Sequence, residues 1–144
     1  MKFNKITNYF DCSENELTTL EGCPVYVGST FDCCYNNLTS LKYSPKYVGD
    51  DFNCSDNNIK RLEYLSCEIG GEFFSDSDLE LIYNILKDNL EYIPNFYDFN
   101  ILDNLDDDRK TLNLKRLKRF VELYNLEELS DGIIYKLKKH YDII

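Results

Sequence analysis

Acidic and small polar side chains recur along the first half of the chain, at positions that a ligand can reach. They flank three copies of a Phe-x-Cys pattern, which begin at Phe10, Phe31 and Phe52 and are spaced by 21 residues. We name this set the acidic face; it comprises Asp11, Ser13, Asp32, Cys34, Asp50, Asp51, Asn53, Ser55 and Glu72. Carboxylates on neighbouring strands repel one another unless a basic surface or a cation compensates them. We expect this face to bind a basic partner, and the alternative is a solvated surface without a ligand. A calcium site is not favoured, because the chain has no EF-hand loop and no Gly-Gly-x-Gly-x-Asp repeat.

A second charged surface is encoded near the C-terminal end. We name it the basic helix face; it comprises Lys115, Arg116, Lys118 and Arg119. On a helical wheel these residues fall opposite an apolar stripe that includes Leu117 and Phe120, as in an ordinary amphipathic helix with one solvated side. The same face could dock an acidic partner, nucleic acid or the acidic face of a second copy, although one basic helix is a weak signal for nucleic acid.

Cysteine, a potential nucleophile, recurs at a fixed position of the repeat. Cys12, Cys33 and Cys54 occupy one column where a side chain should point inward. We expect reduced, buried thiols there, although neighbouring strands about 5 Å apart would also permit a disulfide. Cys34 alone is predicted to face outward, where nearby acids would raise its pKa and make it a poor nucleophile. No CxxC pair occurs and His140, the one histidine, is distant, so no zinc site is expected.

Motifs for catalysis or nucleotide binding are absent from the sequence. It contains no Gly-x-Ser-x-Gly, P-loop, His-Glu-x-x-His or Gly-x-Gly-x-x-Gly pattern. We therefore predict that the chain is not an enzyme and that it needs no metal ion or cofactor.

A repeat of 21 residues positions the acidic face. Asn15, Asn36 and Asn57 occupy the sixth position, Leu or Ile follows at the eighth, Leu at the eleventh, and a Val-Gly or Ile-Gly pair closes each unit. Matching columns at such a period predict a solenoid. Each Phe-x-Cys segment should be a strand, and each Asn should bond the backbone of its own and adjacent turns. The predicted solenoid covers residues 1–75, as a partial unit at 1–9 and repeats at 10–30, 31–51 and 52–72.

Residues 76–144 are predicted to form a helical cap packed on the solenoid. The segment from Ser77 to Glu80 matches a capping box and precedes an apolar series that stops at Pro94. The acidic run at residues 106–108 suits the start of a helix. Helices are expected at 78–92, 109–128 and 131–142, the last after Ser130, with a loop at 94–108.

The repeat pattern Phe-x-Cys-x-x-Asn-x-Leu-x-x-Leu resembles the leucine-rich repeat, Leu-x-Leu-x-x-Asn-x-Leu, over residues 10–75. The short period, with Pro24 and Pro45 on the return arm, is similar to bacterial-type repeats such as those of IpaH-type effectors. Similar Phe-x-Cys repeats occur in phage and large-virus hypothetical proteins. The resemblance implies an α+β fold, a short leucine-rich-repeat solenoid of parallel β rungs with a C-terminal α-helical cap. IpaH-type ubiquitin-ligase activity is not expected, because no cysteine follows Cys67 in this chain.

The charge distribution restricts the expected partners. The net charge of −10 arises from 7 basic and 21 acidic residues in 1–108, against 9 basic and 5 acidic residues in 109–144. An acidic body disfavours direct binding to nucleic acid or an anionic membrane and favours a basic protein. The sequence has no apolar run near 18 residues and no charged, apolar leader, so we expect a cytoplasmic protein, in the host cytoplasm if it is viral.

These features together predict a non-catalytic protein–protein interaction module whose acidic face binds a basic partner. If the phage resemblance holds, the natural setting is a phage accessory protein that blocks a host factor. The alternative is an acidic nucleic-acid mimic that inhibits a host-defence enzyme, such as a CRISPR effector or a restriction nuclease. A mimic should lose binding steeply with salt, whereas an interface built on aromatics such as Tyr35, Tyr43 and Tyr47 should not. Self-association stays open.

Overall fold

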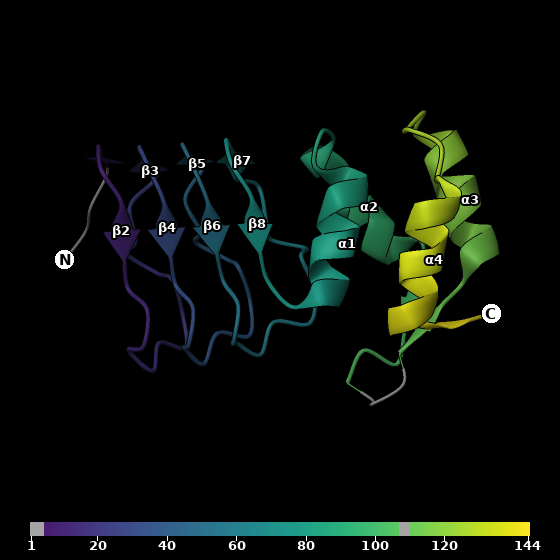
Figure 1. The fold of residues 1–144 in the computed structure, drawn as a ribbon, viewed down its shortest axis with the longest axis horizontal. Coiled ribbons are helices and arrows are strands. Elements are labelled where there is room, and N and C mark those ends of the chain that lie inside the picture. The colour runs from purple at the N-terminus through teal and green to yellow at the C-terminus, as the bar shows by residue number, and fades with distance from the viewer. Residues whose placement is uncertain (1–4, 107–109) are drawn as a thin grey trace. The chain divides into compact units, whose positions relative to one another are not determined.

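The computed structural model describes residues 5–106 and 110–144 (Figure 1). The chain divides into two compact units, Met1–Glu80 and Leu81–Ile144. The first unit contains the repeats, and the second contains most of the helices. The packing of residues 76–144 on the solenoid stays a prediction.

The repeats form a parallel β-solenoid with two short strands in each coil. One sheet has the order β2-β4-β6-β8, with strands Phe10–Asp11, Phe31–Asp32, Phe52–Asn53 and Phe73–Phe74. The other has the order β1-β3-β5-β7, with strands Lys5–Ile6, Tyr26–Val27, Tyr47–Val48 and Glu68–Ile69. Every pair is parallel and joins residues 21 positions apart. The predicted repeat solenoid is therefore confirmed, and its coils stand side by side in Figure 1.

The sheet of β1, β3, β5 and β7 goes beyond the sequence prediction, which treats this segment only as a turn into the next strand. Val27 and Val48 point inward and are fully buried. Tyr26 and Tyr47 point outward and stack, with ring centroids 4.7 Å apart. Strand β1 pairs with β3, so the predicted partial unit at 1–9 does supply a strand, although its residues 1–4 lie outside the described part of the chain.

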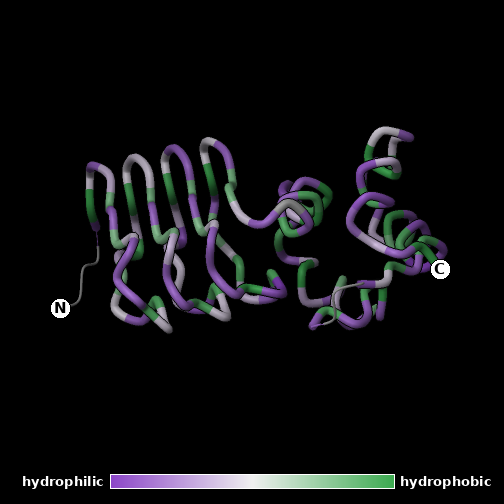
Figure 2. Tube along the Cα trace, turned by 60° about the horizontal axis from the view of Figure 1, so that its bottom comes forward, coloured by the Kyte–Doolittle hydropathy of each residue, from purple (hydrophilic) through white to green (hydrophobic). Residues whose placement is uncertain are grey.

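Apolar columns fill the interior of the solenoid. Phe31, Phe52, Cys33 and Leu38 have no exposed surface, because a coil on either side covers each of them. Phe31 and Phe52 lie 5.1 Å apart between ring centroids, within the range of favourable aromatic pairs. Figure 2 shows the hydrophobic segments in green at the same place in successive coils, which is the pattern of a single continuous core.

The asparagine column ties the coils together, as predicted. The Nδ2 group of Asn36 donates to the carbonyls of Cys33 and Cys34 in its own coil and of Cys12 in the preceding one, at 3.0–3.3 Å. Its Oδ1 accepts from the backbone N–H groups of Asn15 and Leu17, at 3.0 and 2.9 Å. The column therefore satisfies backbone groups that the bend after each strand would leave without partners.

Two further columns are restricted by the backbone, one by its left-handed conformation and the other by the close approach of adjacent coils. Glu14, Tyr35 and Asp56 follow the strands in the left-handed region, with φ between 52° and 56°. Gly28 and Gly49 lie on the return segment, where a Cβ on Gly49 would collide with the carbonyl of Gly28. Adjacent coils approach so closely at this column that only glycine fits.

Helices dominate the chain after the solenoid, but their bounds differ from those predicted. The first, α1, is Ser77–Leu86 and ends before the predicted residue 92. A short 3₁₀ turn, η1 at Leu90–Tyr92, leads into α2 at Ile93–Asp98, within the predicted loop at 94–108. Proline at position 94 is accepted there because the first turn of a helix has no need of its N–H.

The last two helices are confirmed in kind and shorter than expected. Helix α3 is Leu114–Leu123, with Asn113 as its N-cap, and so begins after the predicted residue 109. Helix α4 is Asp131–His140, and the predicted cap Ser130 accepts from the backbone N–H of Ile133. A small sheet, absent from the prediction, joins β9 (Leu102–Asp103), β10 (Thr111–Leu112) and β11 (Asp142–Ile143) in the order β11-β10-β9.

Only some of the residues predicted to cap the helices lie within the described part of the structure. Glu80 accepts a hydrogen bond from the backbone N–H of Ser75 at 2.9 Å, so its carboxylate does turn back towards the start of α1. The other half of the predicted capping box is the Ser77 side chain, which lies outside the described side chains. Of the acidic run at 106–108, residues 107 and 108 also lie outside the described residues.

Candidate functional site

The acidic face is organised by the strands of the first sheet. The register places Asp11 beside Asp32, and Asp32 beside Asn53. Neighbouring strands in a sheet are about 4.8 Å apart, so the two carboxylates are close neighbours. The line continues into Phe74 on β8, whose side chain is 43% exposed. This column therefore presents two acids, an amide and an aromatic ring in succession.

Hydrogen bonds hold the side chains of this column in place. Asp11 Oδ1 accepts from the backbone N–H and the hydroxyl of Ser13, at 2.9 and 2.6 Å. Asn53 does the same for Ser55, at 3.1 and 2.6 Å. Because the bonds from Ser13 favour the ionised carboxylate, the pKa of Asp11 lies below its ordinary value. The column thus has a local structural role whether or not a ligand binds to it.

Two of the acids that precede the strands, Asp50 and Asp51, are also held by hydrogen bonds to neighbouring coils. Asp50 Oδ2 accepts from the Ser29 hydroxyl at 2.9 Å. Asp51 Oδ1 accepts from the backbone N–H of Glu72 at 2.9 Å. Asp50 and Glu72 are exposed, and Asp51 is partly exposed. The carboxylates of Asp50 and Asp51 are therefore held by the solenoid, whereas Glu72 contributes its backbone N–H.

Cys34 does not face outward as predicted. Its side chain is only 9% exposed, because coils on both sides cover the middle position of the column. Burial, a hydrogen bond to Asp32 and the charges of Asp32, Asp11 and Asp56 raise the pKa of Cys34 to about 12. The prediction that this thiol is a poor nucleophile holds, but Cys34 is not an accessible residue of the acidic face.

The remaining thiols are free and unreactive by environment. None of the six cysteines forms a disulfide. Burial, followed by the nearby Asp11 and Asp32 charges, raises the pKa of Cys12 to about 11. Burial raises the pKa of Cys54 to about 12 and moves that of Cys33 further in the same direction. A thiol that stays protonated at neutral pH is neither a good nucleophile nor a ready metal ligand.

Sequence reasoning missed two acids that belong with this surface. Glu14 and Asp56 are exposed and lie in the turns that follow β2 and β6. The charge of Asp56 acts on Cys34 together with those of Asp11 and Asp32. Glu14 and Asp56 occupy the same column two repeats apart, which was visible in the sequence, but Tyr35 stands between them in that column.

Basic side chains do not neutralise the acidic face. In the part of the chain that the structure describes, none of its five carboxylates forms a salt bridge, whereas Arg61 and Glu63 on another edge lie 3.5 Å apart. Like charges on adjacent strands are unfavourable unless a group of opposite charge compensates them. No group of His, Cys, Asp or Glu among the described residues is arranged to hold a metal ion.

The basic helix face lies on α3. Leu117, Phe120 and Val121 are buried, while the basic residues are exposed on the other side. The guanidinium of Arg116 donates to the carbonyl of Asn100 at 3.0 Å, so this side chain already has a structural partner. The other three line a shallow hollow of about 500 Å³ with Leu114 and Glu122.

The tyrosines expected at an aromatic interface differ in exposure. The side chains of Tyr35 and Tyr43 are 59% and 50% exposed, whereas the ring of Tyr47 stacks on that of Tyr26.

Membrane insertion and known relatives give no further guide to function. No helix in the described residues is both long and apolar enough to cross a bilayer. In comparisons with family models, curated proteins and solved structures, nothing matches the chain.

Proposed function

We propose that the chain is a non-catalytic interaction module whose acidic face binds a basic surface of a partner protein. The supporting observation is that carboxylates are held on the solenoid by hydrogen bonds, and that among the described residues none of them forms a salt bridge. Fixed charges lose little conformational entropy when a partner binds, so a preorganised row is better suited to recognition than mobile acids. Electrostatic attraction would also speed association with a basic protein.

The finer assignment follows the same proposal. The solenoid belongs, in this proposal, with leucine-rich repeats of the short bacterial type, because the asparagine column makes the backbone bonds that such a repeat requires. A phage accessory protein acting on a host factor in the cytoplasm is the setting that the repeat pattern favours. The nucleic-acid mimic is the weaker candidate, because the central column carries only Asp11 and Asp32 before it turns into an amide and a ring.

The test exploits a natural substitution within the column. Asn53 makes the same local bonds as Asp11, so Asp→Asn changes should remove charge while preserving the turns. We would capture partners from bacterial lysate with wild type and with Asp11→Asn/Asp32→Asn/Asp51→Asn. The matched control, Glu16→Gln/Glu127→Gln/Glu128→Gln, changes three exposed acids elsewhere by the same total charge.

The expected result is a basic partner whose affinity falls by about tenfold or more in the acidic-face variant and stays near wild type in the control. Equal retention by both variants would refute the proposal and direct attention to the basic helix face. Competition by duplex DNA or RNA for the captured protein would favour the nucleic-acid mimic instead.

A further inference from the structure

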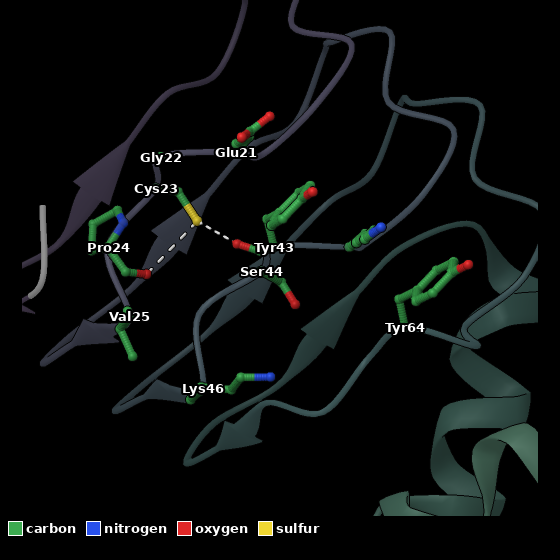
Figure 3. A pocket seen from close by; sticks show the side chains of 10 residues that line it. Glu21, Gly22, Cys23, Pro24, Val25, Tyr43, Ser44, Lys46 and Tyr64 are labelled. Atoms are coloured by element: carbon green, nitrogen blue, oxygen red, sulfur yellow. Dashed lines mark hydrogen bonds between the residues drawn. The ribbon is translucent and has the colours of Figure 1, made fainter. Parts of the chain in front are cut away.

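The turn edge of the solenoid contains a pocket that the acidic face does not use. Each coil bends after its second Leu, where the backbone N–H groups of Cys23, Ser44 and Leu65 donate to carbonyls three residues earlier, at 2.9–3.1 Å. Between these bends lies a cavity of about 480 Å³, a volume typical of ligand pockets (Figure 3). We name it the turn groove; the residues that carry the argument are Cys23, Val25, Lys42, Tyr43, Lys46 and Tyr64.

Apolar and aromatic surface lines the turn groove without being buried in the core. Val25, Tyr43 and Tyr64 are 52%, 50% and 52% exposed. Figure 3 shows the two tyrosine rings projecting from neighbouring coils on the same side of the groove. Half-exposed tyrosines combine a large contact area with few rotatable bonds, and they are enriched in interfaces for that reason.

The floor of the turn groove is fixed. The Cys23 thiol donates to the Tyr43 carbonyl at 2.8 Å and lies 3.7 Å from the Pro24 carbonyl, as the dashed lines in Figure 3 mark. Burial raises the pKa of Cys23 to about 12, so the thiol remains a hydrogen-bond donor at neutral pH. The groove is therefore a preformed cavity and not a reactive cysteine site.

Two ammonium groups give the turn groove a charge opposite to that of its surroundings. Lys42 Nζ lies 5.2 Å from the ring centroid of Tyr43 and 5.8 Å from that of Tyr64. Lys46 Nζ donates to the Ser66 hydroxyl at 2.8 Å, which directs it along the same edge. Glu21 is the acid in the lining, so the groove has a net positive charge, whereas residues 1–80 hold 14 acidic and 6 basic residues.

We propose that the turn groove binds an acidic peptide segment of a partner protein, with an apolar side chain of that segment inserted between Val25, Tyr43 and Tyr64. Lys42 and Lys46 would pair with carboxylates on either side of the inserted residue. A flexible segment suits the concave groove, whereas the acidic face of a second copy is a sheet surface whose short side chains are tied to their own backbone. The site is separate from the acidic face and does not depend on the function proposed for it.

The test uses a defined probe, a fluorescein-labelled octapeptide of alternating aspartate and leucine, with binding followed by fluorescence anisotropy at low ionic strength. Saturable binding is expected, and Lys42→Glu/Lys46→Glu should weaken it by about tenfold or more. Lys60→Glu/Arg61→Glu is the matched control, because it reverses two exposed charges of the same solenoid outside the groove and should weaken binding by less than about threefold. Tyr64→Ala and a peptide with serine in place of leucine should each reduce affinity severalfold.

Several results would overturn the proposal. Equal loss in the two charge-reversal variants would reduce the effect to general attraction, and the absence of saturation would remove the site. Loss of binding only in Lys115→Glu/Lys118→Glu would move the peptide to the basic helix face. A dimer in sedimentation that dissociates in Lys42→Glu/Lys46→Glu would identify a second copy as the occupant. Asp11→Asn/Asp32→Asn/Asp51→Asn should bind the peptide as wild type does, which separates this site from the proposed function.

Discussion

Replacing Asn36 by Ala should destabilise the solenoid more than any other single change in the asparagine column. The Asn36 side chain is 6% exposed and forms five backbone hydrogen bonds that span two coils. Alanine would leave the N–H groups of Asn15 and Leu17 without their acceptor. Each buried polar group left without a partner costs about 1–3 kcal/mol of stability. Water can reach some of these groups in the terminal coil and offset part of that cost. We therefore expect the free energy of unfolding to fall by about 3–5 kcal/mol.

The same column supplies graded controls. Asn15, in the terminal coil, is exposed and donates only to the carbonyls of Cys12 and Ser13, so Asn15→Ala should cost about 1 kcal/mol. Asn57 accepts one backbone N–H, that of Leu38, and bonds three carbonyls. Asn57→Ala should therefore fall between the other two.

The assay can be made specific for the solenoid. All six cysteines lie between residues 12 and 67, and Cys33 and Cys54 are almost completely buried. Reaction of their thiols with an aromatic disulfide reagent during urea unfolding therefore reports on the coils alone, while far-UV circular dichroism follows the whole chain. If Asn36→Ala and Asn15→Ala lost the same stability, side-chain packing, and not the amide column, would be what joins the coils.

Three other changes test further features of the fold by the same unfolding measurements. Gly49→Ala should lower the free energy of unfolding by about 2–3 kcal/mol, because its Cβ would meet the Gly28 carbonyl. The control Gly132→Ala should be neutral or stabilising, because its Cβ would have only an ordinary contact at 3.7 Å. Equal effects of the two changes would contradict the close approach of the coils. Tyr35→Asn should stabilise the solenoid by about 0.5–1 kcal/mol, since asparagine tolerates φ near 52° better, and a loss would mean that the exposed ring makes contacts worth more than the strain. Burial raises the pKa of Cys54 from near 9 to about 12, so the stability that this group contributes is complete below pH 9 and is lost as pH rises towards 12. Cys54→Val should make the alkaline decline in stability less steep by the share of this one thiol, and an unchanged decline would contradict the contribution of Cys54.

The repeat was predictable because its columns are periodic and each has a physical reason. Phenylalanine and cysteine alternate with polar residues as a strand with one buried face requires, and Asn36 bonds both its own coil and the preceding one as expected. The strand at Tyr26–Val27 escaped prediction because a two-residue strand next to Gly28 has the same sequence signature as a turn.

Other features depend on neighbours that a single coil does not reveal. Cys34 has an outward position in the alternation, yet the coils on either side of it leave only 9% of the side chain exposed. Helix α1 stops at Leu86 although its apolar spacing continues, since the backbone N–H of Asn89 bonds the Leu86 carbonyl and starts a turn. The turn groove combines Lys42 and Tyr43 of one coil with Tyr64 of the next, and only the three-dimensional register brings them to one cavity.

The uninterrupted register has a consequence for how such a protein can change in length. The segment 31–51 pairs with its neighbours through the same columns as the segments before and after it. If this segment were removed, Phe52 would stand beside Phe10, Asn57 beside Asn15 and Gly70 beside Gly28, so the phenylalanine, asparagine and glycine columns would all continue. The coil is therefore a unit that duplication or deletion within a gene can add or remove whole, and each copy would lengthen the surfaces along the solenoid by about 4.8 Å.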